Sequence, residues 1–143
     1  VVAHIGLTPQ SVNQLGGFKV QGKDVEAAKK LIDDAKALEA AGAFACVLEC
    51  VPAALASKIT QELTTMATIG IGAGNGCDGQ VLVCNDLLGV SDGFCPKFVK
   101  RYADIHSITV NAVKSYINEV KDRSFPAPEH TFKIDDTVLE KLY

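Results

Sequence analysis

The sequence predicts an α/β protein in which parallel strands are covered by helices, and three observations support this class. Short apolar runs alternate with longer amphipathic segments along the chain. The run over residues 43–49 is apolar at both alternating sets of positions, which is typical of a strand buried in a parallel sheet. The 143 residues amount to about one ordinary domain, and 48% of them are hydrophobic, so a sizeable core can form.

In the first half of the chain, two predicted strands alternate with two predicted helices. In order, these elements cover residues 1–5, 25–41, 43–49 and 52–63. Asp24 is a good N-cap for the first helix, in which apolar residues recur every three or four positions, and Gly42 fits the position after its end. Pro52 suits the first turn of the second helix. The loop over 6–22 is long and polar, and such loops are usually functional or mobile.

The second half of the chain continues with two more strands and then with helices. The strands are predicted over 68–73 and 80–84, and the helices over 96–103, 107–121 and 136–143. Gly70 and Gly72 alternate with isoleucines in the third strand, which indicates a face that something approaches closely. Four strands of this kind fit an open doubly wound sheet or half of an eight-stranded barrel.

Composition argues against several kinds of partner. The net charge of −3 gives no reason to expect nucleic acid or an anionic membrane surface, and no apolar run reaches the ~18 residues of a membrane span. The five cysteines include no C-x-x-C pair, which favours reduced thiols of a cytosolic protein over disulfides or a zinc site. Because the chain opens inside an apolar strand without methionine, we expect further residues upstream or on another chain.

The carboxyl ends of the predicted strands carry the candidate chemistry. His4, Glu49, the Gly72–Gly74 turn and Asn85–Asp86 all fall at such ends, where both architectures bind ligands. Apolar surroundings make a carboxylate more basic, so Glu49 is a candidate general base. The alternative is a structural carboxylate that caps an amide or pairs with a lysine. His4 taken alone is more often a hydrogen-bonded core histidine than a ligand or catalyst.

A metal site or a nucleotide site within this chain is poorly supported. Asp78 and Asp86 are candidate ligands, but each is more often a turn or cap residue, and the carboxylates are not clustered. The glycines over 70–76 follow no G-x-G-x-x-G register and precede no Walker lysine.

Five blocks of the sequence carry a specific resemblance to a known family. They are residues 4–11 (HIGLTPQS), 16–22 (GGFKVQG), 47–52 (VLECVP), 69–74 (IGIGAG) and 78–83 (DGQVLV). In this order they closely resemble ketopantoate hydroxymethyltransferase, over nearly the whole chain but only the second half of the family's sequence. The resemblance implies the second half, about four βα units, of a (β/α)8 TIM barrel plus C-terminal helices, so that residues 1–143 form the carboxyl-terminal half of one barrel domain.

The resemblance also implies a cytoplasmic transferase of pantothenate biosynthesis that forms homo-oligomers, decamers in the family. Such an enzyme transfers a hydroxymethyl group from 5,10-methylenetetrahydrofolate to 3-methyl-2-oxobutanoate through an enolate stabilised by Mg²⁺, and the product is ketopantoate. Glu49 takes the role of proton acceptor, whereas His4, Gly70 and Gly72 are expected to bind substrate. The Mg²⁺ ligands are expected in the amino-terminal half, without which no activity is expected.

Two alternatives stand beside this interpretation. The chain could be a non-catalytic fragment or oligomerisation module. It could also belong to a related barrel that breaks a carbon–carbon bond in 2-oxo acids.

Overall fold

The computed structural model describes residues 1–142, and its centre is a four-stranded sheet in the order β1-β2-β3-β4. All neighbouring strands pair in parallel. The strands are β1 (Val2–Gly6), β2 (Ala45–Glu49), β3 (Ala67–Ile71) and β4 (Gly79–Gln80). The predicted α/β class with parallel strands is confirmed, and a sheet of this kind fits part of a βα barrel.

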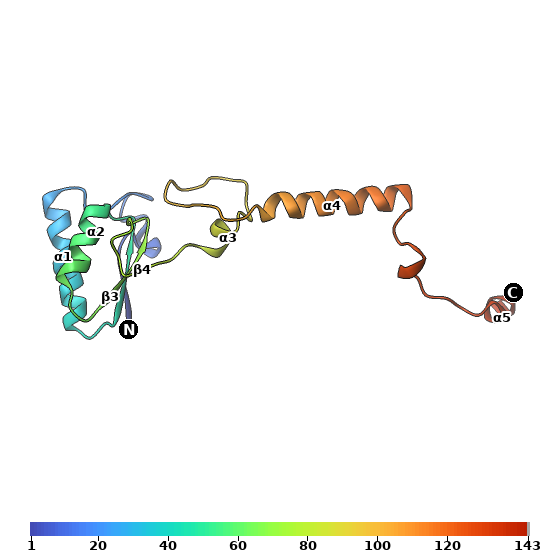
Figure 1. Cartoon of the computed structure of the whole chain (residues 1–143), viewed down its shortest axis with the longest axis horizontal. Coiled ribbons are helices and arrows are strands. Elements are labelled where there is room, and N and C mark those ends of the chain that lie inside the picture. Colours follow the sequence, from blue (N-terminus) through green and yellow to red (C-terminus); the bar gives the residue numbers. More distant parts are fainter. Residues whose placement is uncertain (143) are drawn as a thin grey trace.

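Helices α1 (Val25–Ala40) and α2 (Ala53–Glu62) lie on the same side of the strands (Figure 1). Cys46 and Leu48 of β2 point toward them and are fully buried. The core is completed by Ala3 and Ile5 from β1, Leu31 and Ala35 from α1, and Ala56 and Ile59 from α2. The opposite face of the sheet is more open, since Val2 is 51% exposed there.

Helix α1 begins where the sequence predicts, and α2 begins one residue later than predicted. The Asp24 carboxylate accepts a hydrogen bond from the Ala27 amide at 2.8 Å, which satisfies one of the free N–H groups of the first turn of α1. Pro52 is the N-cap of α2. The strand prediction over 43–49 is wrong at its start, because Phe44 lies outside β2 and is 64% exposed.

Two predictions after β3 are wrong. Instead of a strand over 80–84, β4 ends at Gln80 and the short helix α3 (Cys84–Leu87) follows. In this sheet β4 has a neighbour only on the β3 side, so few ladder bonds keep it extended. The predicted helix over 96–103 is absent. One turn forms where the Val99 amide bonds to the Pro96 carbonyl, and Tyr102 then bonds to Leu87 instead of to its own segment.

The carboxyl-terminal part extends away from the sheet (Figure 1). Its main element is α4 (Ile105–Asp122), which confirms the helix predicted over 107–121. No residue of α4 is buried, and Ile108 is 63% exposed. The helix predicted over 136–143 forms as α5 (Asp136–Leu139) and a following 3-10 turn, while Tyr143 lies outside the described residues. Over residues 1–142, no helix combines the length and the apolarity that a membrane crossing requires.

Candidate functional site

His4 and Glu49 lie together near the carboxyl ends of two neighbouring strands. In the β1–β2 register, His4 pairs with Val47 and Gly6 pairs with Glu49, so the two side chains share one face of the sheet. The distance from His4 Nε2 to Glu49 Oε2 is 3.1 Å. The side chains are 31% and 18% exposed, respectively. The structure therefore brings together the two polar residues that the sequence placed at neighbouring strand ends.

Within the described residues, one ring nitrogen of His4 has no hydrogen-bond partner. Its Nε2 is buried, and within the described residues it makes no hydrogen bond of acceptable geometry. Its contact with Glu49 is short enough for a hydrogen bond, but the atoms are not aligned for one. Leaving a buried polar atom unpaired costs about 1–3 kcal/mol. The arrangement therefore favours a ligand that hydrogen-bonds to this nitrogen beside the carboxylate.

The backbone around Glu49 is fixed from both sides. The Leu7 amide donates to the Glu49 carbonyl at 2.8 Å, and the Cys50 amide donates to the Ile71 carbonyl at 2.9 Å. Gly6 has a φ of +87°, and a Cβ atom there would lie 2.3 Å from the Glu49 carbonyl oxygen. Gly6 is a supporting residue that the sequence reasoning missed, although a glycine directly after the predicted strand over 1–5 was a visible signal.

Cys50 follows Glu49 in a left-handed backbone conformation, with a φ of +50°. Its thiol is half-buried. Burial, and secondarily the charge of Glu49, raise the pKa of the Cys50 thiol above its ordinary value. The thiol is therefore protonated at neutral pH, which disfavours a nucleophilic role.

A cavity of about 730 Å³ lies beside the His4–Glu49 pair. Its wall comes from Val20, from residues 50–53 after β2, from the β3–β4 loop, from residues 80–82 and from the segment 97–102. His4 and Glu49 are not part of this wall. They adjoin it through Cys50 and through Gly72, which follows the β3 partner of Glu49. The sequence did not predict this cavity.

The two glycines predicted to contact substrate occupy different environments. Gly72 lines the cavity, has a φ of +64°, and leaves no room for a Cβ atom, which would lie 2.9 Å from the Phe98 ring. Gly70 is buried, and a Cβ atom there would lie 2.9 Å from the Gln80 amide nitrogen. Side chains of this protein therefore approach both glycines closely. That Gly70 and Gly72 contact substrate stays a prediction.

The acidic residues considered as metal ligands have structural surroundings. Asp78 Oδ2 accepts hydrogen bonds from the amide and the hydroxyl of Thr68, at 2.7 and 3.1 Å. Asn85 and Asp86 belong to α3, so their predicted place at a strand end is wrong, because β4 stops at Gln80. Over residues 1–142, no three His, Cys, Asp or Glu side chains gather around one point. These residues do not fit a Mg²⁺ site, which requires several oxygen ligands. That the complete enzyme uses Mg²⁺, as the resemblance implies, stays a prediction.

Comparisons with known proteins agree on one family. Residues 1–128 match the family described as Ketopantoate hydroxymethyltransferase. Proteins named 3-methyl-2-oxobutanoate hydroxymethyltransferase are 65% identical in Enterococcus faecalis, 61% in Clostridium novyi and 59% in Carboxydothermus hydrogenoformans. Each alignment covers 100% of this chain and 51% or 52% of the relative, so the chain spans about half the length of these relatives.

Proposed function

Because the chain belongs to the ketopantoate hydroxymethyltransferase family, we propose that it contributes the catalytic base of an enzyme that hydroxymethylates 3-methyl-2-oxobutanoate. The one-carbon donor in this proposal is 5,10-methylenetetrahydrofolate, and the product is ketopantoate. One observation carries the assignment: the Glu49 carboxylate lies 3.1 Å from His4 Nε2, on neighbouring parallel strands. Ligands of α/β sheets bind at this end of the strands.

In the proposed reaction, Glu49 acts as the base. The C3–H bond of the oxo acid breaks, the proton passes to the Glu49 carboxylate, and the electron pair forms the enolate. Carbon C3 then bonds to the methylene carbon of the donor, and both C–N bonds of that carbon break as tetrahydrofolate leaves. Water supplies the new hydroxyl group, and its other proton, with the proton held by Glu49, passes to the two departing nitrogens. A partly buried carboxylate suits the first step, because Glu49 is only 18% exposed and loses little hydration when substrate arrives.

His4 is the proposed contact to the oxo acid. Its Nε2 is buried and unpaired within the described residues, so an oxygen atom of the substrate completes its hydrogen bonding when Nε2 carries the proton. The same nitrogen lies 3.1 Å from the Glu49 carboxylate, so it places the bound oxo acid beside the base. This role orients the reacting carbon without requiring His4 to transfer a proton.

We further propose that residues 1–143 form one half of a (β/α)8 barrel. In the described sheet, β1 pairs only with β2, and β4 pairs only with β3. Open strand edges invite pairing with further strands, and closure into a barrel removes them. The resemblance also implies that the complete enzyme is cytoplasmic and forms homo-oligomers, and we include both in this proposal.

The test follows hydrogen exchange at C3 of 3-methyl-2-oxobutanoate in deuterated water, with the complete enzyme and added Mg²⁺. We expect exchange without donor and net transfer only with methylenetetrahydrofolate. Glu49→Gln should lower the exchange rate by about a hundredfold or more, as is typical when a general base is removed. Glu140→Gln, the same change at an exposed residue of the carboxyl-terminal tail, should leave the rate unchanged.

The outcomes separate the three functional readings. Undiminished exchange in Glu49→Gln would remove this residue as the base. Absence of both exchange and transfer in the complete enzyme would favour a non-catalytic module. Cleavage of the oxo acid without any requirement for the donor would favour a carbon–carbon lyase.

A further inference from the structure

We propose that the cavity beside Glu49 binds the one-carbon donor and that Lys97 and Lys100 hold the carboxylates of its glutamate tail. This inference rests on the function proposed above and assigns residues to its second substrate. The ligand class is a reduced pteridine joined to an anionic glutamyl chain. Four features of the cavity support the assignment: its position, its charge, its wall and the anchoring of its lysines.

The position of the cavity separates the two substrates. His4 and Glu49 lie outside its wall, whereas Cys50, directly after Glu49, lies within it. A ligand in the cavity therefore reaches the neighbourhood of the base without occupying the place proposed for the oxo acid. A reaction that joins carbon atoms of two substrates requires such adjacent places.

The charge of the cavity favours an anion. Its wall contains Lys97 and Lys100 and no carboxylate. Neither ammonium group forms an ion pair with any residue between 1 and 142. Lys100 Nζ lies 4.9 Å above the ring of Tyr102, a cation–π contact that uses none of its three N–H groups in an ion pair. Two carboxylates on one ligand match two lysines in one cavity.

The rest of the wall suits a flat ring with polar edges. Val20, Val81 and Phe98 supply apolar and aromatic surface. Gln80 donates through Nε2 to the Gly74 carbonyl at 2.9 Å, which fixes its amide and leaves its oxygen as an acceptor. At about 730 Å³, the cavity falls within the 300–1,000 Å³ range of sites for ligands of drug size, whereas the oxo acid has only a few heavy atoms.

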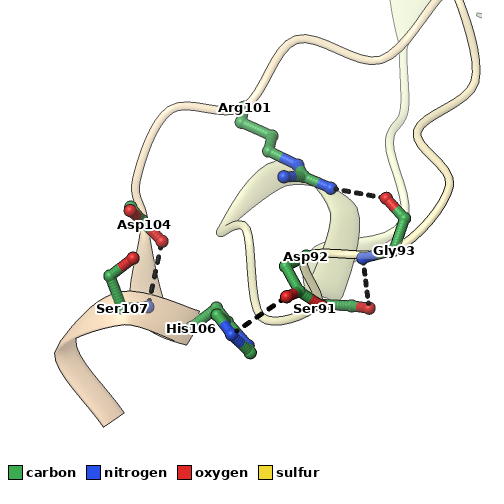
Figure 2. Close-up of polar contacts among 7 residues, drawn as sticks. All are labelled: Ser91, Asp92, Gly93, Arg101, Asp104, His106 and Ser107. Atoms are coloured by element: carbon green, nitrogen blue, oxygen red, sulfur yellow. Dashed lines mark hydrogen bonds and ion pairs between the residues drawn. The ribbon is translucent and has the colours of Figure 1, made fainter. Parts of the chain in front are cut away.

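The segment that carries the lysines is anchored to neighbouring elements. The Tyr102 amide donates to the Leu87 carbonyl at 2.8 Å. Figure 2 shows the contacts nearby: Arg101 donates to the Gly93 carbonyl at 3.3 Å, and Asp92 lies 3.4 Å from His106 at the start of α4. Lys97 and Lys100, which line the cavity, therefore belong to a segment that is held at Arg101 and Tyr102.

The first measurement compares steady-state kinetics of the complete enzyme with those of its Lys97→Gln/Lys100→Gln variant. We expect KM for methylenetetrahydrofolate to rise about tenfold, from the loss of two exposed ion pairs. The maximal rate, KM for the oxo acid and the exchange at C3 should stay unchanged. Lys29→Gln/Lys114→Gln, the same change at exposed positions of α1 and α4, is the matched control and should leave every parameter unchanged.

The second measurement is equilibrium binding of two probes to the same proteins. Tetrahydrofolate should bind the Lys97→Gln/Lys100→Gln variant about tenfold more weakly than the wild type. Tetrahydropteroate lacks the glutamate and should bind both proteins equally. An unchanged KM for the donor, equal losses for both probes, or a raised KM for the oxo acid would each overturn the assignment. Absence of C3 exchange in the wild type would instead refute the proposed function, so the two failures are distinguishable.

Discussion

At the scale of single residues, Glu49 is positioned mainly through backbone contacts. Its carbonyl accepts from Leu7, the following amide donates to Ile71, and Gly6 provides the space that the Glu49 carbonyl occupies. The carboxylate is thus held at the end of β2 by two neighbouring strands. A change that displaces this backbone moves the carboxylate even though the glutamate itself is retained.

Gly6→Ala tests this dependence. The added Cβ atom would lie 2.3 Å from the Glu49 carbonyl oxygen, at a φ of +87° that disfavours any side chain. We expect a loss of about 2–4 kcal/mol in the free energy of unfolding, measured by urea denaturation of the chain. Gly42→Ala is the control, because its φ is +93° but a Cβ atom there meets nothing within 4 Å. It should cost only about 1–2 kcal/mol, and an equal loss in both variants would contradict the steric argument.

Glu39 gives a prediction about pH. Its Oε1 accepts hydrogen bonds from the amides of Thr65, Met66 and Thr64, which lower the pKa of the Glu39 carboxyl from 4.5 to about 2. Because the folded state lowers this pKa, the stabilisation is present above pH 4.5 and is lost as the pH falls toward 2. Glu39→Gln should remove this part of the pH dependence of stability.

The measurement is thermal unfolding of both proteins between pH 5 and pH 2. The melting temperature of the wild type should fall more steeply with decreasing pH than that of Glu39→Gln. Glu26→Gln, at an exposed position in the first turn of the same helix, should retain the slope of the wild type. Parallel curves for the wild type and Glu39→Gln would contradict the assignment.

At the scale of elements, a small polar network holds the β3–β4 connection. The fully buried hydroxyl of Thr68 lies 2.8 Å from the hydroxyl of Thr60 on α2. The amide and hydroxyl of Thr68 also bind the Asp78 carboxylate, and the Asp78 amide donates back to the hydroxyl at 3.2 Å. This network fixes the loop whose other residues, Gly74 and Asn75, line the cavity.

Thr68→Val should weaken this connection while keeping the volume of the side chain. The Thr60 hydroxyl and the Asp78 carboxylate each lose a partner, so we expect a loss of about 1–3 kcal/mol in the free energy of unfolding. Thr109→Val on the exposed side of α4 is the matched control and should stay within about 0.5 kcal/mol of the wild type. Equal stabilities of all three proteins would show that the network does not stabilise the fold.

Prediction from the sequence succeeded for elements whose signals are local. The helix after Asp24 forms because its cap and its apolar periodicity lie within one segment. Residues 80–84 and 96–103 carry equally suggestive local patterns but fold differently. Their backbone partners lie far away in the sequence, as when Tyr102 bonds to Leu87, and no local pattern contains that information.

For the same reason, part of the candidate site could be predicted from the sequence and part could not. His4 and Glu49 could be placed together because parallel pairing alone brings neighbouring strand ends to one rim. The cavity could not be predicted, because its wall requires the segment 97–102 to return over the β3–β4 loop. The role of Gly6 could not be predicted either, because the atom that leaves no room for a side chain there is the Glu49 carbonyl oxygen on another strand.

At the scale of the whole molecule, α4 contrasts with the sheet. It has no buried residue, although its side carrying Val113, Tyr116 and Val120 is apolar. An isolated helix of this length is marginal in water, since most helical stability in proteins comes from tertiary packing. We therefore expect amide protection factors in α4 to be at least about a hundredfold lower than in β2, by hydrogen–deuterium exchange of this chain. Equal protection would show that α4 is stabilised by contacts outside the described arrangement.

The one-sided covering of the sheet also bears on when the base can work. Helices α1 and α2 protect one face, while His4 and Glu49 lie on the other. Whatever covers that second face also removes water from the carboxylate, and desolvation strengthens a carboxylate as a base. In the proposed enzyme, the remaining exposed part of the Glu49 carboxylate would therefore lose its water only when the second face is covered, so the base would reach its full strength in the completed fold.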